Sequence, residues 1–281
     1  MLGKVLILGG TGLLGQALVS VLRELQLTPL APARQELDVL NFAALQDYLT
    51  EHRPTAIFNA VAYTQVDRAE DEEDAAMLLN RDLPGQLARM VKDENTWLLH
   101  YSTDFVFDGK KQRPYNPEDA TNPLGAYGRS KLAGEKAILE QNLDNACIVR
   151  TSWLFGPGRK NFVATILGKA LAGEDLRVVD DQTGSPTFTE DLASYSLSLA
   201  QTRRPGIFHI ANRGAASWFA LAEAALKLKD LHTSITPIKT GDFPCKALRP
   251  AYSVLHTKRF TEVTGIVPRT WTTALEDYLG A

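Results

Sequence analysis

An apolar run, a turn with three evenly spaced glycines and an amphipathic segment follow one another near the start of this 281-residue chain. Residues 5–8 predict a buried strand, residues 9–15 form the glycine turn, and the apolar residues of 16–22 recur at helical spacing. The first glycine permits a tight turn, the second lets the backbone approach a pyrophosphate, and the third lets helix and strand pack closely. The unit predicts the first step of a dinucleotide-binding sheet, although a glycine-rich turn that binds nothing has the same pattern.

The segment after this unit bears on the choice of cofactor. The next predicted strand, 27–31, lacks the acidic residue that usually binds the ribose 2′-hydroxyl of NAD, and Arg34 follows it. A guanidinium suits a 2′-phosphate, so we expect NADPH, with NADH possible, unless Arg34 is only a surface residue. Asp38 and Val39 are candidates to flank the adenine, or else a loop and a core residue. The predicted cofactor-binding residues are Gly9, Thr11, Gly12, Leu13, Leu14, Gly15, Arg34, Asp38, Val39, Ala60, Ala62, Tyr63, Tyr127 and Lys131.

A strand end rich in hydroxyl groups and a Tyr-x-x-x-Lys pair make the second chemical signal. The apolar run 97–101 predicts a buried strand that ends at two hydroxyls and a carboxylate, where ligands bind in open α/β sheets. Tyr127 and Lys131 share one face of a predicted helix. A nearby cation lowers the pKa of a phenol and tunes it as a general acid. With Thr103 as a further hydrogen-bonding group, we predict these residues to be catalytic; an ordinary helix with a solvated lysine is the alternative.

The composition excludes several kinds of partner. The chain is 44% hydrophobic and 22% charged, with a formal net charge of −3, so nothing indicates nucleic acid or a membrane surface. No apolar run reaches the roughly 18 residues of a spanning helix, and the first residues lack the apolar core of a secretory signal. We therefore expect a cytoplasmic protein, either a monomer or a homodimer, whose partner is a small molecule.

Other titratable residues predict no metal site. Cys147 and Cys245 have no metal-ligand spacing and fit the reduced thiols of a cytoplasmic protein. The five histidines are scattered, and His100, inside a predicted strand, is expected to be a satisfied core side chain. Lys246 and Arg249 are candidates to meet an anionic substrate, or else solvated surface charges.

Strand-like and helix-like segments alternate along the first half of the chain. This alternation predicts an α/β fold with a doubly wound parallel sheet (Rossmann), followed by a smaller substrate-binding lobe. Pro84 is expected to kink or split one helix. The NADP(H)-binding domain would comprise 1–155 with a return segment near 189–212, and the smaller lobe 156–188 with 213–281. The predicted strands are 5–8, 27–31, 56–62, 97–102, 147–155, 176–180 and 207–211, and the predicted helices are 42–52, 71–92, 127–140, 161–172, 189–200 and 219–229.

The glycine turn, Thr103 and the Tyr127/Lys131 pair together resemble the extended short-chain dehydrogenase/reductase superfamily. Within it the chain is most similar to the branch typified by dTDP-4-dehydrorhamnose reductase. Sister dehydratases carry a glutamate after the aspartate of the active-site strand, where this chain has Phe105. The segments that carry the resemblance to the reductase branch are 59–70, 102–109, 150–155 and 184–187.

The resemblance implies a two-lobed enzyme that uses NADPH to reduce the C4 keto group of dTDP-4-dehydro-L-rhamnose, giving dTDP-L-rhamnose. Tyr127 would protonate the developing alkoxide, and Lys131 would hold the nicotinamide ribose and lower the pKa of the phenol. Thr103 and Asp104 would bind the sugar, and Trp153 would pack against its ring unless it is a core side chain. Two alternatives stay open: a reductase of another nucleotide-linked 4-keto-6-deoxy sugar, and a non-catalytic NADP-binding regulatory subunit. The implied substrate-binding residues are Thr103, Asp104, Tyr127 and Trp153.

Overall fold

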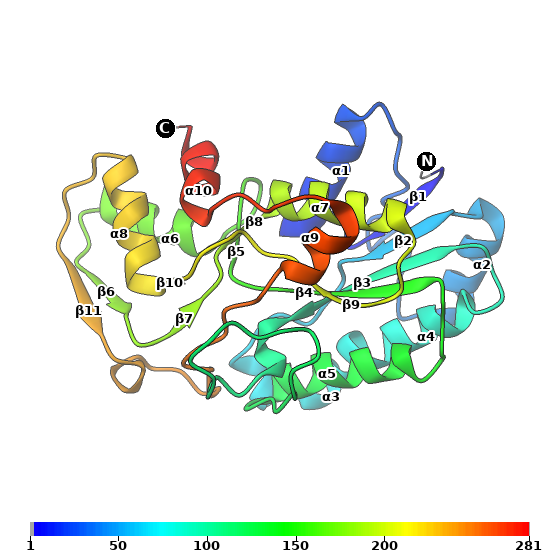
Figure 1. Cartoon of the computed structure of the whole chain (residues 1–281), viewed down its shortest axis with the longest axis horizontal. Helices are drawn as coiled ribbons and strands as arrows, with labels where there is room; N and C mark the ends of the chain where they lie inside the picture. The colour runs from blue at the N-terminus through cyan, green and yellow to red at the C-terminus, as the bar shows by residue number, and fades with distance from the viewer. Residues whose placement is uncertain (1–2, 281) are drawn as a thin grey trace.

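The computed structural model describes residues 3–280, and a parallel sheet lies at their centre (Figure 1). Within these residues the sheet has five strands in the order β1-β2-β3-β4-β9, and every neighbouring pair is parallel. Strands β1 to β4 are buried along their whole length, which explains their almost uninterrupted apolar sequences. The predicted doubly wound fold is confirmed. The strands are β1 (Val5–Leu8), β2 (Ala56–Asn59), β3 (Trp97–Thr103), β4 (Ala146–Thr151) and β9 (Gly206–His209).

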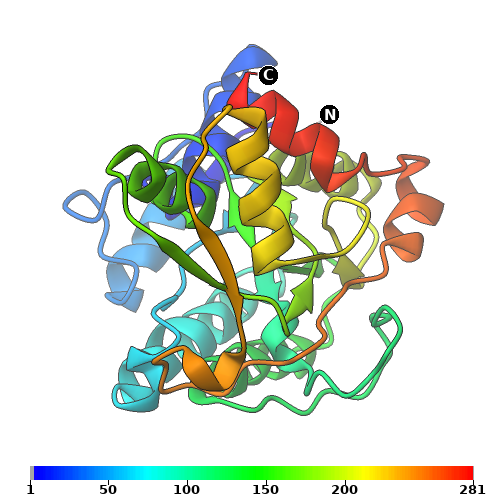
Figure 2. The same cartoon turned by 90° about the vertical axis from the view of Figure 1, so that its left-hand side faces the viewer.

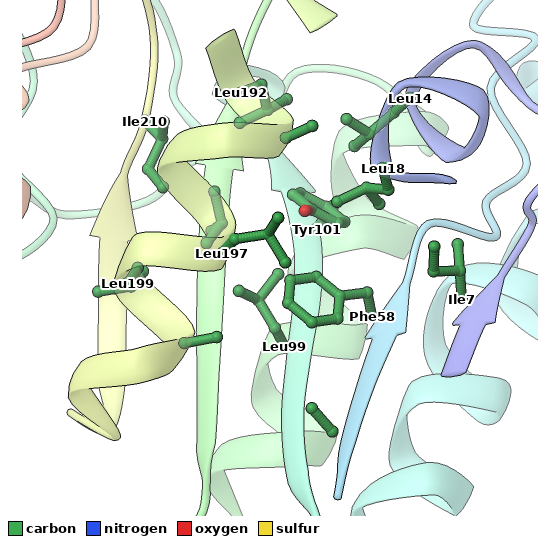
Figure 3. Close-up of a cluster of buried hydrophobic side chains, with 14 of the residues drawn as sticks. Ile7, Leu14, Leu18, Phe58, Leu99, Tyr101, Leu192, Leu197, Leu199 and Ile210 are labelled. Atoms are coloured by element: carbon green, nitrogen blue, oxygen red, sulfur yellow. The ribbon is translucent and has the colours of Figure 1, made fainter. Parts of the chain in front are cut away.

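Alternate side chains of each strand point to opposite faces of the sheet, because the side-chain period of a strand is two. On one face Ile7, Phe58 and Leu99 pack against α1 (Leu13–Glu24) and α7 (Thr189–Thr202), as Figure 3 shows. Short helix α9 (Lys258–Thr264) adds Phe260 to the same cluster. The result is one continuous core that joins the glycine-turn helix to a helix from the second half of the chain.

The opposite face of the sheet carries the helix with the Tyr-x-x-x-Lys pair. Ile57 and Ile148 pack there against α2 (Phe42–His52), α4 (Leu83–Met90) and α5 (Ala126–Leu139). In Figure 1, α4 and α5 lie below the sheet and α1 and α7 above it. The first turn of α5 therefore lies beside the carboxyl end of β3, where the hydroxyl groups are.

Three expected elements are shorter than the sequence predicts. Segment 27–31 forms no strand: only Leu30 bridges to β1, its N–H donating to the Val5 carbonyl and its C=O accepting from the Ile7 N–H, both at 2.8 Å. The next residue that would donate on this side is Pro32, which has no N–H. The strand expected at 56–62 ends at Asn59. The strand expected at 147–155 is interrupted by Trp153, whose φ of 50° is left-handed.

The helix expected over 71–92 is divided, as Pro84 predicted, but the irregular turn precedes the proline. It consists of α3 (Glu73–Met77), a π-helical turn (Leu78–Asp82) and α4, with Pro84 in the first turn of α4. Gly134 of α5 packs directly on this turn, and a Cβ there would overlap the Asn80 carbonyl oxygen. The close approach of the two helices thus depends on a glycine.

The remaining helices and strands gather at one end of the sheet, the left-hand end of Figure 1 and the near side of Figure 2. They have apolar clusters of their own, which include Val163, Leu221 and Leu275. The division into two lobes at the expected boundaries stays a prediction. The elements here are α6 (Phe162–Leu171), β6 (Leu176–Val179), α8 (Trp218–Leu228), β11 (Ile235–Ile238) and α10 (Trp271–Leu279), with the short strands β5 (Leu154–Phe155), β7 (Thr183–Gly184), β8 (Thr187–Phe188) and β10 (Ala216–Ser217) nearby.

Two kinds of feature are absent from residues 3–280. No helix in this range combines the length and the apolar character needed to cross a membrane. Over the same range, no three His, Cys, Asp or Glu side chains are grouped so that they could hold a metal ion.

Candidate active site

The carboxyl end of β3 places Thr103 and Asp104 side by side in the interior, 5% and 2% exposed. The Thr103 hydroxyl accepts from the Phe105 N–H at 3.2 Å and donates to Asp104 Oδ1 at 3.1 Å. The Ser253 hydroxyl, from a distant segment, donates to Asp104 Oδ2 at 2.5 Å. Burial raises the pKa of Asp104 to about 6, although the hydrogen bonds from Ser253 and Thr103 act in the opposite direction. A buried carboxylate with two hydroxyl partners therefore lies at the base of the site.

Tyr127 lies in the first turn of α5, with its ring edge against Phe105 at a centroid distance of 5.6 Å. The helix begins at Ala126, whose N–H donates to Glu70 Oε1 at 2.8 Å. Burial raises the pKa of Tyr127 to about 12; a hydrogen bond from Thr103 lowers it and the charge of Asp104 raises it further. The phenol is therefore fully protonated at neutral pH.

Lys131, one turn further along α5, is 2% exposed. Its Nζ donates to the Tyr101 carbonyl at 2.5 Å and lies 3.4 Å from His100 Nε2. Burial lowers the pKa of Lys131 to about 8, against the opposing charge of Glu135. The predicted lowering of the Tyr127 pKa by Lys131 is wrong for this structure, because burial of the phenol dominates and its pKa is raised.

The glycine turn joins β1 to α1 in the way that its spacing predicts. Gly9 has a φ of 84°, and a Cβ at Gly15 would overlap the Gly9 carbonyl oxygen. Gly12 is the N-cap of α1 and makes no side-chain cap, so the first N–H groups of the helix are open. A Cβ at Gly12 would meet only the Gly9 oxygen within 4 Å, at 3.2 Å. This cradle of backbone N–H groups fits the pyrophosphate of a dinucleotide.

Ala60, Ala62 and Tyr63 connect the glycine turn with the Tyr127 helix. A Cβ at Gly9 would lie 3.0 Å from the Ala60 carbonyl carbon. Tyr63 packs with Tyr127 against a cluster of buried alanines, and its N–H donates to Asn80 Oδ1 at 2.9 Å. The structure thus brings together the glycine turn, the end of β2 and the first turn of α5.

Three of the expected cofactor residues lie in the loop between Leu30 and α2. Arg34 and Asp38 are exposed, and Asp38 Oδ1 accepts from the Leu40 N–H at 3.1 Å. Val39 is partly buried and packs against the core on the α2 face. Thr11 is exposed, and its carbonyl accepts from Arg159 Nε at 2.9 Å.

Trp153 follows β4 with its ring stacked on Trp218, at a centroid distance of 3.5 Å and an interplanar angle of 5°. Gly184 lies against the same ring, and a Cβ there would overlap it. The left-handed φ of a tryptophan is unusual and costs free energy that the surrounding contacts must supply. Trp153 is partly buried and packs against an apolar cluster, so its expected contact with the sugar ring stays a prediction.

A hollow of about 410 Å³ opens beside this tryptophan stack. Its walls are mostly apolar, but three cationic side chains stand at its edge, Lys169, Arg177 and Arg249. The other residues that line it are Phe162, Thr165, Ile166, Asp175, Leu176, Val178, Val179, Gln182, Trp218 and Phe243.

Sequence reasoning missed several residues that hold the site together. Asp67 accepts from the N–H groups of Lys246 and Ala247 at 3.0 Å and from Arg249 at 2.8 Å, and Asp71 pairs with the Lys246 ammonium. Lys246 and Arg249 thus have carboxylate partners here. Three further contacts were not predicted, because each joins positions that are distant in sequence: Glu70 with Ala126, Ser253 with Asp104, and Asn59 with His100.

Comparisons with known proteins agree with this geometry. A family model described as the RmlD substrate binding domain matches residues 3–281. A Streptomyces niveus protein named dTDP-4-keto-6-deoxy-D-glucose reductase is 38% identical over 277 residues, 98% of this chain and 96% of that protein. The dTDP-4-dehydrorhamnose reductase of Streptomyces griseus is 38% identical over 279 residues, 97% and 91% of the two chains. A crystal structure of dTDP-4-dehydrorhamnose reductase from Bacillus anthracis in complex with NADP superposes with a TM-score of 0.94 at 33% identity, covering 99% of each chain.

Proposed function

This chain belongs to the RmlD substrate binding domain family, and we propose that it is a dTDP-4-dehydrorhamnose reductase, which uses NADPH to reduce the C4 keto group of dTDP-4-dehydro-L-rhamnose to give dTDP-L-rhamnose. One observation carries the proposal. The end of β3 and the start of α5 bring together Thr103, Asp104, Tyr127 and Lys131. The end of β2, at Ala60, lies between this group and the glycine turn, where the open N-terminus of α1 fits the pyrophosphate of a dinucleotide.

The residues around the glycine turn fit NADPH, which when bound supplies the hydride. Gly12 and the first turn of α1 bind the pyrophosphate through backbone N–H groups. Ala60 and Ala62 leave room for flat rings, with Asp38 and Val39 at the adenine end. Arg34 binds the 2′-phosphate, and the NADP complex of the Bacillus anthracis relative supports this choice. NADH is a weaker alternative cofactor.

Tyr127 donates the proton that the reduced oxygen needs. As the keto carbon is reduced, its oxygen becomes a strongly basic alkoxide, and the protonated phenol of Tyr127 can transfer its O–H proton to it. Lys131 holds the nicotinamide ribose and stabilises the phenolate that is left. When the sugar is bound, the Thr103 hydroxyl turns its hydrogen from Asp104 to the sugar oxygen, and Asp104, still held by Ser253, orients the sugar.

The remaining part of the substrate occupies the hollow beside the tryptophan stack. Trp153 packs against the sugar ring, and the aromatic walls of the hollow accommodate the thymine. Arg249 Nη1 is buried and has no hydrogen-bond partner within residues 3–280. A diphosphate would supply that acceptor, in the bidentate geometry that a guanidinium favours. In this assignment the 156–188 and 213–281 segments act as the substrate-binding lobe.

The test is NADPH consumption at the nicotinamide absorbance band with dTDP-4-dehydro-L-rhamnose. Tyr127→Phe should lower kcat by about 10²–10⁴-fold, the usual contribution of a general acid, while NADPH binding persists. Tyr48→Phe is the matched control, because the ring of this tyrosine lies tilted at 59° against His52 of α2, away from the site. Full activity of the Tyr127→Phe variant would refute the role of Tyr127 as the proton donor.

A second reductase function is supported by one relative. The Streptomyces niveus protein is named for a different sugar, dTDP-4-keto-6-deoxy-D-glucose, at the same 38% identity. Comparing kcat/KM for the two dTDP-linked sugars, with a UDP analogue as control, decides between them. NADPH binding without turnover on either sugar would instead indicate a non-catalytic regulatory subunit. A cytoplasmic location completes the proposal and is supported by two free cysteines, Cys147 and Cys245; a monomer and a homodimer are both compatible with it.

A further inference from the structure

A row of three buried polar side chains runs from Asn59 through His100 to Lys131, and the hydrogen-bonding role of each side chain restricts the role of the next. Asn59 at the end of β2 and His100 in the middle of β3 are both 0% exposed. Asn59 Nδ2 lies 3.1 Å from His100 Nδ1, and His100 Nε2 lies 3.4 Å from Lys131 Nζ. Nothing in the proposed chemistry uses Asn59 or His100, yet they are the groups on the inner side of the lysine.

The orientation of Asn59 is determined by the backbone. Its Oδ1 accepts from the Val61 N–H at 3.2 Å, so Nδ2, a donor, must face the His100 ring. Reversing the amide would set two donors against each other at Val61. His100 Nδ1 is therefore the acceptor.

The imidazole then has only one arrangement of its hydrogen. Burial, and next the charge of Lys131, hold the pKa of His100 well below its usual range, so the ring is neutral and carries one N–H. With Nδ1 accepting, that hydrogen is on Nε2 and points toward Lys131 Nζ. An ammonium has only donors, whereas a neutral amine can accept this hydrogen. The ring thus favours the neutral form of Lys131, while the Tyr101 carbonyl accepts from Nζ in both forms.

We propose that Asn59 and His100 are positioning residues. Asn59 holds the imidazole of His100 in its Nε2–H tautomer, and this tautomer sets the pH at which Lys131 loses its proton. This inference deepens the proposed function, on which it rests for the role of Lys131 in reduction. Among the other titratable groups nearby, Glu135 acts on Lys131 through its charge and is itself paired with Arg150 of β4. Tyr127 lies one turn before Lys131 on α5, and the charge of Asp104 acts on Tyr127.

The first experiment reads the tautomer directly and needs no substrate. Long-range ¹⁵N NMR of the full chain with NADPH bound distinguishes a protonated ring nitrogen from an unprotonated one, and His100→Gln assigns the signal. His209 is an internal reference of opposite kind, because its Nδ1 lies 3.0 Å from the Tyr115 carbonyl, which only accepts. We expect the hydrogen on Nε2 in His100 and on Nδ1 in His209. A hydrogen on Nδ1 of His100 overturns the inference.

The second experiment switches the tautomer. Asn59→Asp keeps the acceptor for Val61 but replaces the donor with a carboxylate, which draws the ring hydrogen to Nδ1 and turns the lone pair of Nε2 toward Lys131. We expect the titration of Lys131, followed by the ¹³Cε shift, to move up by about one pH unit or more. The basic limb of the kcat profile should move with it, whereas a merely structural change lowers kcat without moving the limb.

Asn80→Asp is the matched control, since Asn80 is equally buried but contacts Tyr63 and Ser130 instead of His100. It should leave the His100 tautomer unchanged, and a switch in this variant would overturn the assignment to Asn59. An unchanged Lys131 titration in Asn59→Asp would overturn it as well. If that variant does not fold, the wild-type tautomer still decides. A protein that shows the expected tautomer and titration but reduces no keto sugar would refute the proposed function alone.

Discussion

The ion pair between Glu135 and Arg150 joins the helix of the proposed general acid to the sheet. Glu135 lies one turn after Lys131 on α5, and Arg150 lies on β4. The two side chains are 1% and 3% exposed, and the guanidinium donates twice to the carboxylate, at 2.9 and 2.7 Å. The Ser102 hydroxyl donates to the same carboxylate at 2.5 Å. A change at Glu135 therefore affects stability through a fully desolvated charge.

Glu135→Gln keeps the shape of the side chain but leaves the Arg150 guanidinium buried without a counter-charge. Removing one partner of a buried pair costs about 3–5 kcal/mol. Because glutamine retains one acceptor, we expect the free energy of unfolding to fall by about 3 kcal/mol, near the lower end of that range. For a chain of this size this corresponds to a decrease in Tm of roughly 6–12 °C.

Urea unfolding followed by circular dichroism measures this cost by linear extrapolation. The control is Glu73→Gln, which removes the carboxylate of an exposed pair with Arg129 on the same helix, at 3.2 Å with side chains 45% and 44% exposed. An exposed pair contributes at most about 1 kcal/mol. Equal costs for the two variants would refute the reasoning, because burial would then not determine the energy of the pair.

Two further predictions concern the same helix. The pKa of Lys131 is lowered to about 8 from about 10.4 in an unfolded chain, so between these values the unfolded state binds more protons and the free energy of unfolding rises with pH, by up to about 3 kcal/mol. Lys131→Met should lose this rise in urea titrations from neutral pH to about pH 10.5, and equal pH slopes would contradict it. Gly134→Ala should destabilise by about 1–3 kcal/mol because its Cβ overlaps the Asn80 oxygen. Gly168→Ala on α6 is the control: no atom lies within 4 Å of the added Cβ, so this variant should be more stable by up to about 1 kcal/mol. If thermal melts show the same change in stability for both variants, the π-helical turn shifts to make room for the Cβ at position 134, and the prediction is wrong.

The parts of the fold that follow local rules could be predicted from sequence. Buried parallel strands have continuous apolar runs, so β1, β3 and β9 were expected close to their actual positions, and α2 was expected at its observed bounds. The errors occur where tertiary contacts override local preference. The π-helical turn at Leu78–Asp82 packs directly on Gly134 of α5, and Trp153, where the expected strand is interrupted, stacks on another ring.

The residues of the candidate site also fall into those that the sequence reveals and those that it does not. Thr103, Tyr127 and Lys131 could be recognised because they follow a strand or share a helix face. The partners that hold them could not, since the Ser253–Asp104 bond spans 149 residues and the Ala126–Glu70 bond spans 56. No periodicity or motif links positions that far apart, so these contacts become visible only in the folded chain.

The pKa of Tyr127 shows why spacing alone is insufficient even for residues that were recognised. A turn of helix guarantees that Lys131 is near, but its Nζ is directed to the Tyr101 carbonyl and its own charge is disfavoured by burial. Desolvation acts on both groups in the direction of neutrality, raising the pKa of the phenol and lowering that of the ammonium. At neutral pH Tyr127 is therefore a protonated phenol and Lys131 is largely charged. As the pH rises past about 8, Lys131 becomes a neutral amine while Tyr127 keeps its proton. Since only the charged lysine can stabilise a phenolate, the proton on Lys131 rather than that on Tyr127 should limit reduction on the alkaline side.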